Sequence, residues 1–198
     1  MKNKVITISR QLGSGGRTIG RELAKRLNIP CYDQEIIEML AKESGFSEDY
    51  IKDNSDYAIN KGFLAGIFSD RVYDTPITQD VLWDAQKAVV LDLAKKGNCV
   101  IIGRCADHIL ADEADCLRVF LHADAEKRAK RVVEIYGETD ESPAKRIADK
   151  DKRREAYILK YTGKRWGEAV NYHLCLDTGN LGIDKCIEII YGIYNAVK

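Results

Sequence analysis

The sequence predicts an α/β fold in which a parallel sheet of five strands lies between two layers of helices. Three observations support this prediction. Short apolar, β-branched runs alternate along the chain with segments of helical periodicity, which is the pattern of strands joined by helical crossovers. The first strand is followed directly by a glycine cluster and a helix, the opening of an α/β unit. The length of 198 residues suits one domain.

The first half of the chain contains two such units. A buried strand is expected at 5–9, where β-branched residues dominate, and a helix at 17–27, where apolar residues recur at helical spacing. A very short strand at 31–33 and a helix at 34–42 follow. Residues 46–76 mix aromatic, acidic and glycine residues, and we expect short helices there.

The second half repeats the alternation. Strands are expected at 99–103, 117–121 and 172–177. Helices are expected at 78–96, 124–136, from 142 onward and at 183–194. Thr78 and Asp124 are candidate N-caps, and Ser142 followed by Pro143 is an N-cap with proline at the first helical position.

The composition excludes several classes of protein. Lys and Arg number 31, as do Asp and Glu, so the net charge is zero, unlike that of most nucleic-acid binders. No apolar run approaches the ~20 residues of a membrane span, and the N-terminus does not resemble a signal peptide. The six cysteines lack a C-x-x-C pair or zinc-ligand spacing with the three histidines. We therefore expect reduced thiols in a cytoplasmic monomer or homodimer that binds neither nucleic acid nor membrane.

A glycine-rich loop joins the first strand to its helix. Small residues let backbone N–H groups converge on an anion at a helix N-terminus. The residues expected to bind phosphate are Arg10, Gly13, Ser14, Gly15, Gly16, Arg17 and Thr18. The alternative is a glycine-rich turn that binds no ligand.

The loop departs from the standard phosphate-binding pattern G-x-x-x-x-G-K-[ST]. If Gly15 is the second glycine of that pattern, its first glycine falls on Arg10 and its lysine on Gly16. An arginine can supply the missing charge with a different reach and a forked geometry. Arg17 is the first candidate for this catalytic cation, and Thr18 is the candidate hydroxyl near Mg²⁺.

Four stretches of the chain, in order, resemble the cytidylate kinase-like family, a branch of the P-loop nucleoside monophosphate kinases. The first comprises Ile6–Gln11, Gly13–Gly16 and Ile19-Gly20. The second is Tyr32-Asp33 with Ile36-Ile37, and the third is Val100–Arg104 followed by Leu117–Leu121. The fourth comprises Asp151–Arg154, Tyr157, Tyr161–Gly163, Trp166-Gly167, Tyr172 and Leu176–Thr178.

The resemblance implies a P-loop NTPase fold, a three-layer α/β/α arrangement within a single domain. Its core would be residues 1–33, 97–136 and 167–198, its nucleoside monophosphate-binding insert 34–96 and its lid 137–166. The resemblance also implies ATP as donor, Mg²⁺, and a nucleoside monophosphate acceptor, with CMP or dCMP as the default. Cytidylate kinases carry the loop lysine and an acidic residue after the glycine-arginine pair, where this chain has Gly16 and Cys105.

Two further residues follow strand ends, where ligands of such folds bind. Arg104 is a candidate for holding the acceptor phosphate, and its alternative role is a surface salt bridge. Asp33 is a candidate contact of the acceptor ribose or of a magnesium-bound water. Its alternative role is the N-cap of the helix that follows.

The expected lid carries a run of basic residues. Spacings of three and four place Arg146, Lys150, Arg153 and Arg154 on one helix face, which could meet a triphosphate, with Arg153 as a second catalytic candidate. The alternative is a solvated helix with i,i+4 ion pairs.

The predicted function is ATP-dependent phosphoryl transfer to a small acceptor, most simply a nucleoside monophosphate. Two alternatives stay open at this point. One is a regulatory nucleotide-binding protein that lost catalysis together with its lysine. The other is a kinase of a different small metabolite.

Overall fold

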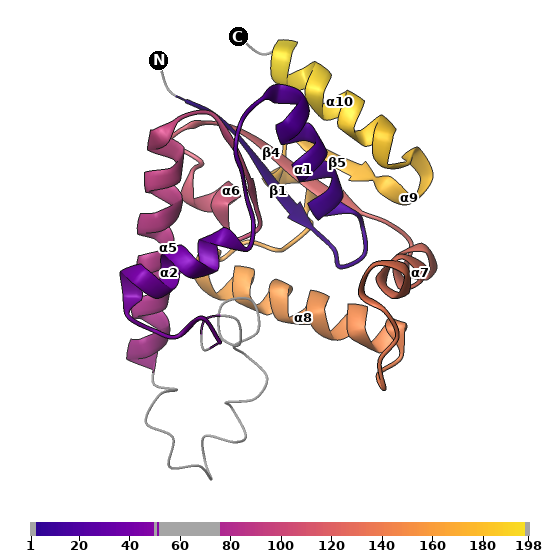
Figure 1. Cartoon of the computed structure of the whole chain (residues 1–198), viewed down its shortest axis with the longest axis horizontal. Helices are drawn as coiled ribbons and strands as arrows, with labels where there is room; N and C mark the ends of the chain where they lie inside the picture. The colour runs from indigo at the N-terminus through magenta and orange to yellow at the C-terminus, as the bar shows by residue number, and fades with distance from the viewer. Residues whose placement is uncertain (1–2, 50, 52–75, 197–198) are drawn as a thin grey trace.

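Five parallel strands form one sheet in the order β2-β3-β1-β4-β5 (Figure 1). The computed structural model describes residues 3–49, 51 and 76–196. The strands are β1 (Lys4–Arg10), β2 (Cys31–Tyr32), β3 (Cys99–Ile102), β4 (Asp115–His122) and β5 (Leu174–Asp177). The predicted α/β class with a five-stranded parallel sheet is confirmed.

Helices cover both faces of the sheet. Their bounds are α1 (Gly16–Leu27), α2 (Glu35–Ser44), α5 (Pro76–Lys96), α6 (Ala106–Ile109), α7 (Ala125–Tyr136), α8 (Pro143–Thr162), α9 (Thr178–Leu181) and α10 (Ile183–Ala196), with a 3₁₀ turn at Ala169–Asn171. One core cluster joins α1 and α10 to the sheet, and another joins α2, α5 and α6 to its opposite face. Figure 1 shows α7 and α8 beyond the carboxyl end of β1.

The central strand β1 explains the apolar run at the N-terminus. It pairs with β3 on one side and β4 on the other. Ile6 and Ile8 face α1 and α10, whereas Val5 belongs to the cluster of the opposite face. A strand that is paired on both sides and covered on both faces is buried along its length, so β-branched residues predominate at 5–8, and the polar Thr7 and Ser9 are buried as well.

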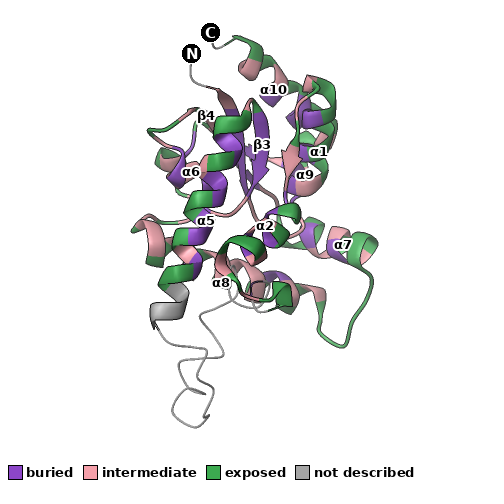
Figure 2. Ribbon diagram, turned by 60° about the vertical axis from the view of Figure 1, so that its left-hand side comes forward, coloured by how far each residue is buried: buried purple, intermediate pink, exposed green. Residues whose placement is uncertain are grey.

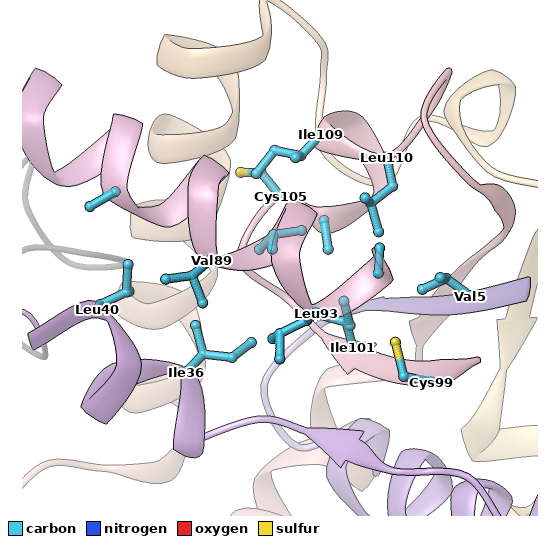
Figure 3. Close-up of a cluster of buried hydrophobic side chains, with 14 of the residues drawn as sticks. Val5, Ile36, Leu40, Val89, Leu93, Cys99, Ile101, Cys105, Ile109 and Leu110 are labelled. Carbon is cyan, nitrogen blue, oxygen red and sulfur yellow. The ribbon is translucent and has the colours of Figure 1, made fainter. Parts of the chain in front are cut away.

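The core between the sheet and α5 consists of interlocking aliphatic side chains (Figure 3). Ile36 and Leu40 of α2 point toward Val89 and Leu93 of α5, and Leu93 lies beside Ile101 of β3. Figure 2 shows the corresponding pattern over the whole molecule, with buried residues on the sheet and on the helix sides that face it. Apolar burial of this kind is the main stabilising term of the fold.

The second half of α8 packs into this body. Tyr157 is buried, and the Tyr161 ring stacks on Trp83 of α5 with ring centroids 4.5 Å apart. Farther along, the Trp166 indole donates a hydrogen bond to Ser9 Oγ at 3.0 Å. The residues at 157–166 are thus anchored, and the proposed boundaries of the insert (34–96) and the lid (137–166) remain predictions.

Element ends differ from the sequence expectations in several places. The β4 strand is longer at both ends, and β5 begins two residues late because a 3₁₀ turn precedes it. Ser142 caps α8 as predicted, accepting a hydrogen bond from the Lys145 amide at 3.3 Å. Asp124 occupies the N-cap position of α7 as predicted, although its side chain makes no capping hydrogen bond in this described segment. Thr78 lies inside α5, which begins at Pro76, so that N-cap prediction was wrong. The short helices expected at 46–76 fall mostly outside the described residues.

Two expectations from composition can be compared with the structure. All six cysteines are free thiols. In the part of the chain that the structure describes, no helix is long and apolar enough to cross a membrane.

Truncation of Leu93 should test the core beneath α5. Leu93 is 1% exposed, whereas Val81 of the same helix is 45% exposed. We expect Leu93→Ala to lower the free energy of unfolding by about 2–5 kcal/mol, because it leaves a cavity in a packed core. Val81→Ala should change it by less than about 0.5 kcal/mol. Urea unfolding measures both, and equal losses would contradict the packing described here.

Candidate functional site

The loop between β1 and α1 depends on two glycines with left-handed backbone. Gly13 and Gly15 have φ angles of +81° and +79°, which strain residues with a Cβ atom. A Cβ added to Gly13 would lie 2.6 Å from the Arg128 carbonyl oxygen. Among the described residues no side chain caps the N-terminus of α1. Its first amides and the positive end of the helix dipole therefore remain available to an anion.

A nearly buried ion pair between α7 and α8 restrains the conformation of this loop. Arg128 of α7 contacts Asp151 of α8 at 2.5 Å, and their side chains are 11% and 15% exposed. Asp151 also accepts a hydrogen bond from the Leu12 amide at 2.8 Å, while Arg128 donates to the Leu12 carbonyl at 3.2 Å. Both backbone polar groups of Leu12 are thus held by one ion pair, which restrains the loop.

Arg154, one of the predicted lid cations, also holds the loop. Its guanidinium donates to the Arg10 carbonyl at 3.0 Å and lies 3.7 Å from Asp151. The Arg154 side chain is only 12% exposed. This arrangement ties α8 to the carboxyl end of the central strand.

A cavity of about 340 Å³ opens above the loop. Its charged lining residues are Arg10, Arg17, Arg21, Arg131 and Glu22. Gly13, Gly15, Gly16 and Thr18 line it as well, so the structure brings most of the predicted phosphate-binding residues together. Four arginines against one carboxylate create a positive potential that favours a polyanion.

A second cavity of about 540 Å³ lies between the loop and the first half of α8. Arg146, Lys150 and Arg153 line it, as do Leu12, Arg17 and Tyr136, which also line the first cavity. Asp140, Glu141 and Asp149 offset part of its positive charge. Three of the four predicted lid cations therefore face a space next to the loop.

Arg17 is paired with the buried Asp33. Its Nε lies 2.8 Å from Asp33 Oδ2, and Arg21 Nη2 lies 3.7 Å from the same oxygen. Asp33 is 4% exposed. The alternative role of Asp33 as a helix N-cap is wrong, because α2 begins at Glu35 and Gln34 occupies its N-cap position. Asp33 instead directs the Arg17 side chain.

Glu35 stabilises the turn that carries Asp33. The Asp33 amide donates to Glu35 Oε2 at 3.0 Å. Hydrogen bonds from the backbone amide of Glu35 itself, and then from that of Asp33, lower the pKa of the Glu35 carboxyl. An ionised Glu35 therefore keeps the strand end in place at neutral pH.

Arg104 follows β3 in an unusual backbone conformation. Gly103, Arg104 and Cys105 have φ angles of +76°, +61° and +51° in succession. Two consecutive non-glycine residues in the left-handed region store strain, and strained residues concentrate at functional sites. The fully buried Gln86 of α5 donates from Nε2 to the Arg104 carbonyl at 3.0 Å. Gln86 thus supports the turn that presents Arg104.

Two predicted loop contacts have protein partners. The Ser14 hydroxyl and amide both donate to the Gln11 carbonyl, at 2.9 and 3.3 Å. Thr18 Oγ1 accepts a hydrogen bond from Arg131 at 2.9 Å, which is a poor setting for a metal ligand. No group of three or more His, Cys, Asp or Glu residues in the described segments could hold a metal. These residues do not fit a resident Mg²⁺.

Sequence reasoning missed Arg128, Arg131, Asp151 and Gln86. Arg128 and Arg131 carried a detectable signal, since they lie three residues apart in the helix that follows the fourth strand. Asp151 belongs to the fourth stretch of the family resemblance, but that resemblance does not indicate its contact with Arg128. Gln86 carried no signal, because its importance depends on a carbonyl 18 positions away.

The parallel sheet, the glycine loop after its central strand and the arginine-lined cavity define a phosphotransferase of the P-loop kinase class. The family model of the cytidylate kinase-like family matches residues 5–180, and the chain belongs to this family. It is 27% identical over 186 residues to a cytidylate kinase from Pyrobaculum islandicum, covering 93% of this chain and 89% of that protein.

Solved structures agree with the fold. An uncharacterised protein from Eubacterium ventriosum superposes with a TM-score of 0.72 at 25% identity, over 97% of this chain and 98% of that one. Shikimate kinase from Acinetobacter baumannii, in complex with shikimate, has a TM-score of 0.54 at 13% identity, over 100% and 96% of the two chains. The second likeness concerns the fold alone.

Removal of the Asp151 carboxylate should loosen the glycine loop. We expect Asp151→Ala to cost about 3 kcal/mol of unfolding free energy, because it leaves the Arg128 charge without its partner in a nearly buried position. The Leu12 amide should also exchange its hydrogen faster. Glu141→Ala is the control, since the Glu141–Lys145 pair is exposed and should contribute at most about 1 kcal/mol. Similar losses in both variants would refute the role given to Asp151.

Proposed function

We propose that the protein transfers the γ-phosphoryl group of ATP to the phosphate of a nucleoside monophosphate, with CMP and dCMP as the first acceptors to test. The observation that carries this proposal is the arginine-lined cavity above the glycine loop at the carboxyl end of β1. Membership of the cytidylate kinase-like family and the similarity to a cytidylate kinase support the choice of acceptor.

The loop would hold the donor phosphates. The first amides of α1, from Gly16 to Thr18, would donate hydrogen bonds to phosphate oxygens, and arginines around the cavity would neutralise their charge. Magnesium would arrive as Mg·ATP, coordinated largely by the phosphates and water, as is usual for this ion in nucleotide sites.

Arg104 would bind the acceptor phosphate. It follows β3, the neighbour of β1, so both strand ends reach the same edge of the sheet. Arg153, with Arg146 and Lys150 beside it in the second cavity, would neutralise charge on the transferred group. Asp33 would act by holding Arg17 between the two substrates.

Catalysis by such a site consists of positioning and charge stabilisation. An oxygen of the acceptor phosphate attacks the γ-phosphorus in line with the bond to the β,γ-bridging oxygen. That bond breaks as the new one forms, so the products are ADP and a nucleoside diphosphate. The guanidinium groups stabilise the charge spread over the equatorial oxygens of the transferred group.

A coupled assay of ADP release tests this function. Purified protein receives Mg·ATP together with CMP, dCMP, UMP, AMP or GMP, and shikimate serves as an acceptor that is not a nucleotide. Turnover confined to CMP and dCMP supports the proposal. Turnover with shikimate alone would identify a metabolite kinase, and ATP binding without turnover on any of these acceptors would favour a regulatory protein.

Arg104→Ala should affect the acceptor far more than the donor. We expect KM for the acceptor to rise about 10-fold to 100-fold, since a charge-assisted hydrogen bond contributes about 1.5–3 kcal/mol, with little change in KM for ATP. The control is Arg26→Ala, because Arg26 packs on the Tyr191 ring in the last turn of α1. Equal, small effects on both substrates would remove Arg104 from the acceptor site.

A further inference from the structure

The loop departs from the standard pattern at three positions, since Arg17 also stands where that pattern has Ser or Thr, and two of the three, Arg10 and Gly16, touch each other. Arg10 stands where that pattern has its first glycine, and Gly16 stands where it has lysine. A Cβ added to Gly16 would lie 2.8 Å from Arg10 Cβ and 2.7 Å from Arg10 Cγ. The Arg10 side chain therefore occupies the space into which a lysine at position 16 would project.

The far end of the same side chain reaches the neighbouring strand. A Cβ added to Gly103 would overlap the Arg10 guanidinium, with Cζ only 3.0 Å away. Arg10 thus extends from the carboxyl end of β1, past the first residue of α1, to the carboxyl end of β3. It also lines the cavity above the loop.

The backbone of Arg10 is held in place. Its carbonyl accepts the hydrogen bond from Arg154, and the Gln11 amide that follows donates to the Leu121 carbonyl of β4 at 3.0 Å. Because its backbone is held and its side chain lies against Gly16 and Gly103, Arg10 loses little further conformational entropy when it binds an anion. Such preorganisation favours electrostatic stabilisation.

Arg17 is less suited to the same role. Its Nε is engaged by Asp33, which is nearly inaccessible to solvent. Moving Arg17 onto a phosphate would leave a buried carboxylate with a weaker partner, which is unfavourable.

We propose that Arg10 is the cation that takes the place of the loop lysine, and that Gly16 is glycine because Arg10 needs its space. Compared with the standard pattern, the cationic residue lies at the end of β1 (Arg10) instead of at the start of α1. The glycine lies at the start of α1 (Gly16) instead of at the end of β1. The ligand is the polyphosphate of a nucleoside triphosphate, which the planar guanidinium can bind through two parallel hydrogen bonds. The inference rests on the proposed function in that it assumes donor phosphates on the loop.

A set of exchange variants tests this inference. The variants are Arg10→Met, Gly16→Lys, Arg17→Met and the double variant Arg10→Gly/Gly16→Lys, with Arg26→Ala as a control away from the cavity. Calorimetry measures binding of ATP and of inorganic tripolyphosphate, and the ADP-release assay measures kcat/KM. Circular dichroism melting confirms that each variant is folded.

Arg10→Met should weaken ATP and tripolyphosphate binding about 10-fold or more and lower kcat/KM about 100-fold. Arg17→Met should weaken tripolyphosphate binding much less.

Gly16→Lys alone should also impair binding, because the new side chain collides with Arg10. The double variant should bind better than Gly16→Lys alone, since it restores the standard arrangement of glycine and lysine. If Arg10→Met does not fold, the comparison of the double variant with Gly16→Lys decides the question.

Other results separate this inference from the proposed function. Unchanged tripolyphosphate binding by a folded Arg10→Met, or a double variant no better than Gly16→Lys, overturns the inference while kinase activity can persist. Arg10-dependent tripolyphosphate binding without turnover on any acceptor overturns the proposed function and supports the role of Arg10. If the protein binds no triphosphate at all, both proposals fail.

Discussion

The ion pair between Arg128 and Asp151 is the interaction on which the arrangement of the site depends. It lies where α7 and α8 meet the glycine loop, and it satisfies both backbone polar groups of Leu12. Burial of a charge pair is favourable only when its remaining hydrogen-bonding groups are also satisfied, and the loop backbone fulfils that condition here. The pair and the loop therefore stabilise each other, and α8 is drawn to the carboxyl end of β1, where Arg154 binds the Arg10 carbonyl.

The arginines at this edge of the sheet fall into two groups, which differ in exposure and in the groups that they contact. Arg128 and Arg154 have little exposure and bind backbone carbonyls, so they build the site. Arg10, Arg17 and Arg131 line the cavity above the loop, and Arg146 and Arg153 line the cavity beside it. The chain as a whole is neutral, but the charged lining of the cavity above the loop consists of four arginines and Glu22. Nearby, Asp33 is paired with Arg17 and Asp151 with Arg128.

The fold was more predictable than the site. The strand at 5–9 was clear because β-branched residues predominate in a strand that is covered on both faces. The Ser142 cap was equally clear, since it depends on residues within one turn. Asp33 and Arg154 were harder to interpret, because each had several plausible partners and only the packing of distant elements selects one. The segment at 46–76, which lacks a readable pattern, lies largely outside the described residues.

By itself the sequence determined the α/β class, the glycine loop and the general region of the basic residues, because periodicity, turn chemistry and charge are local properties of the chain. Only the tertiary structure decided which residues each arginine contacts. It showed Arg17 held by Asp33, and it showed the Arg10 side chain lying over Gly16 and reaching Gly103. The physical reason is that a long side chain can reach many partners, and its partner is chosen by strands and helices that meet only in the folded molecule.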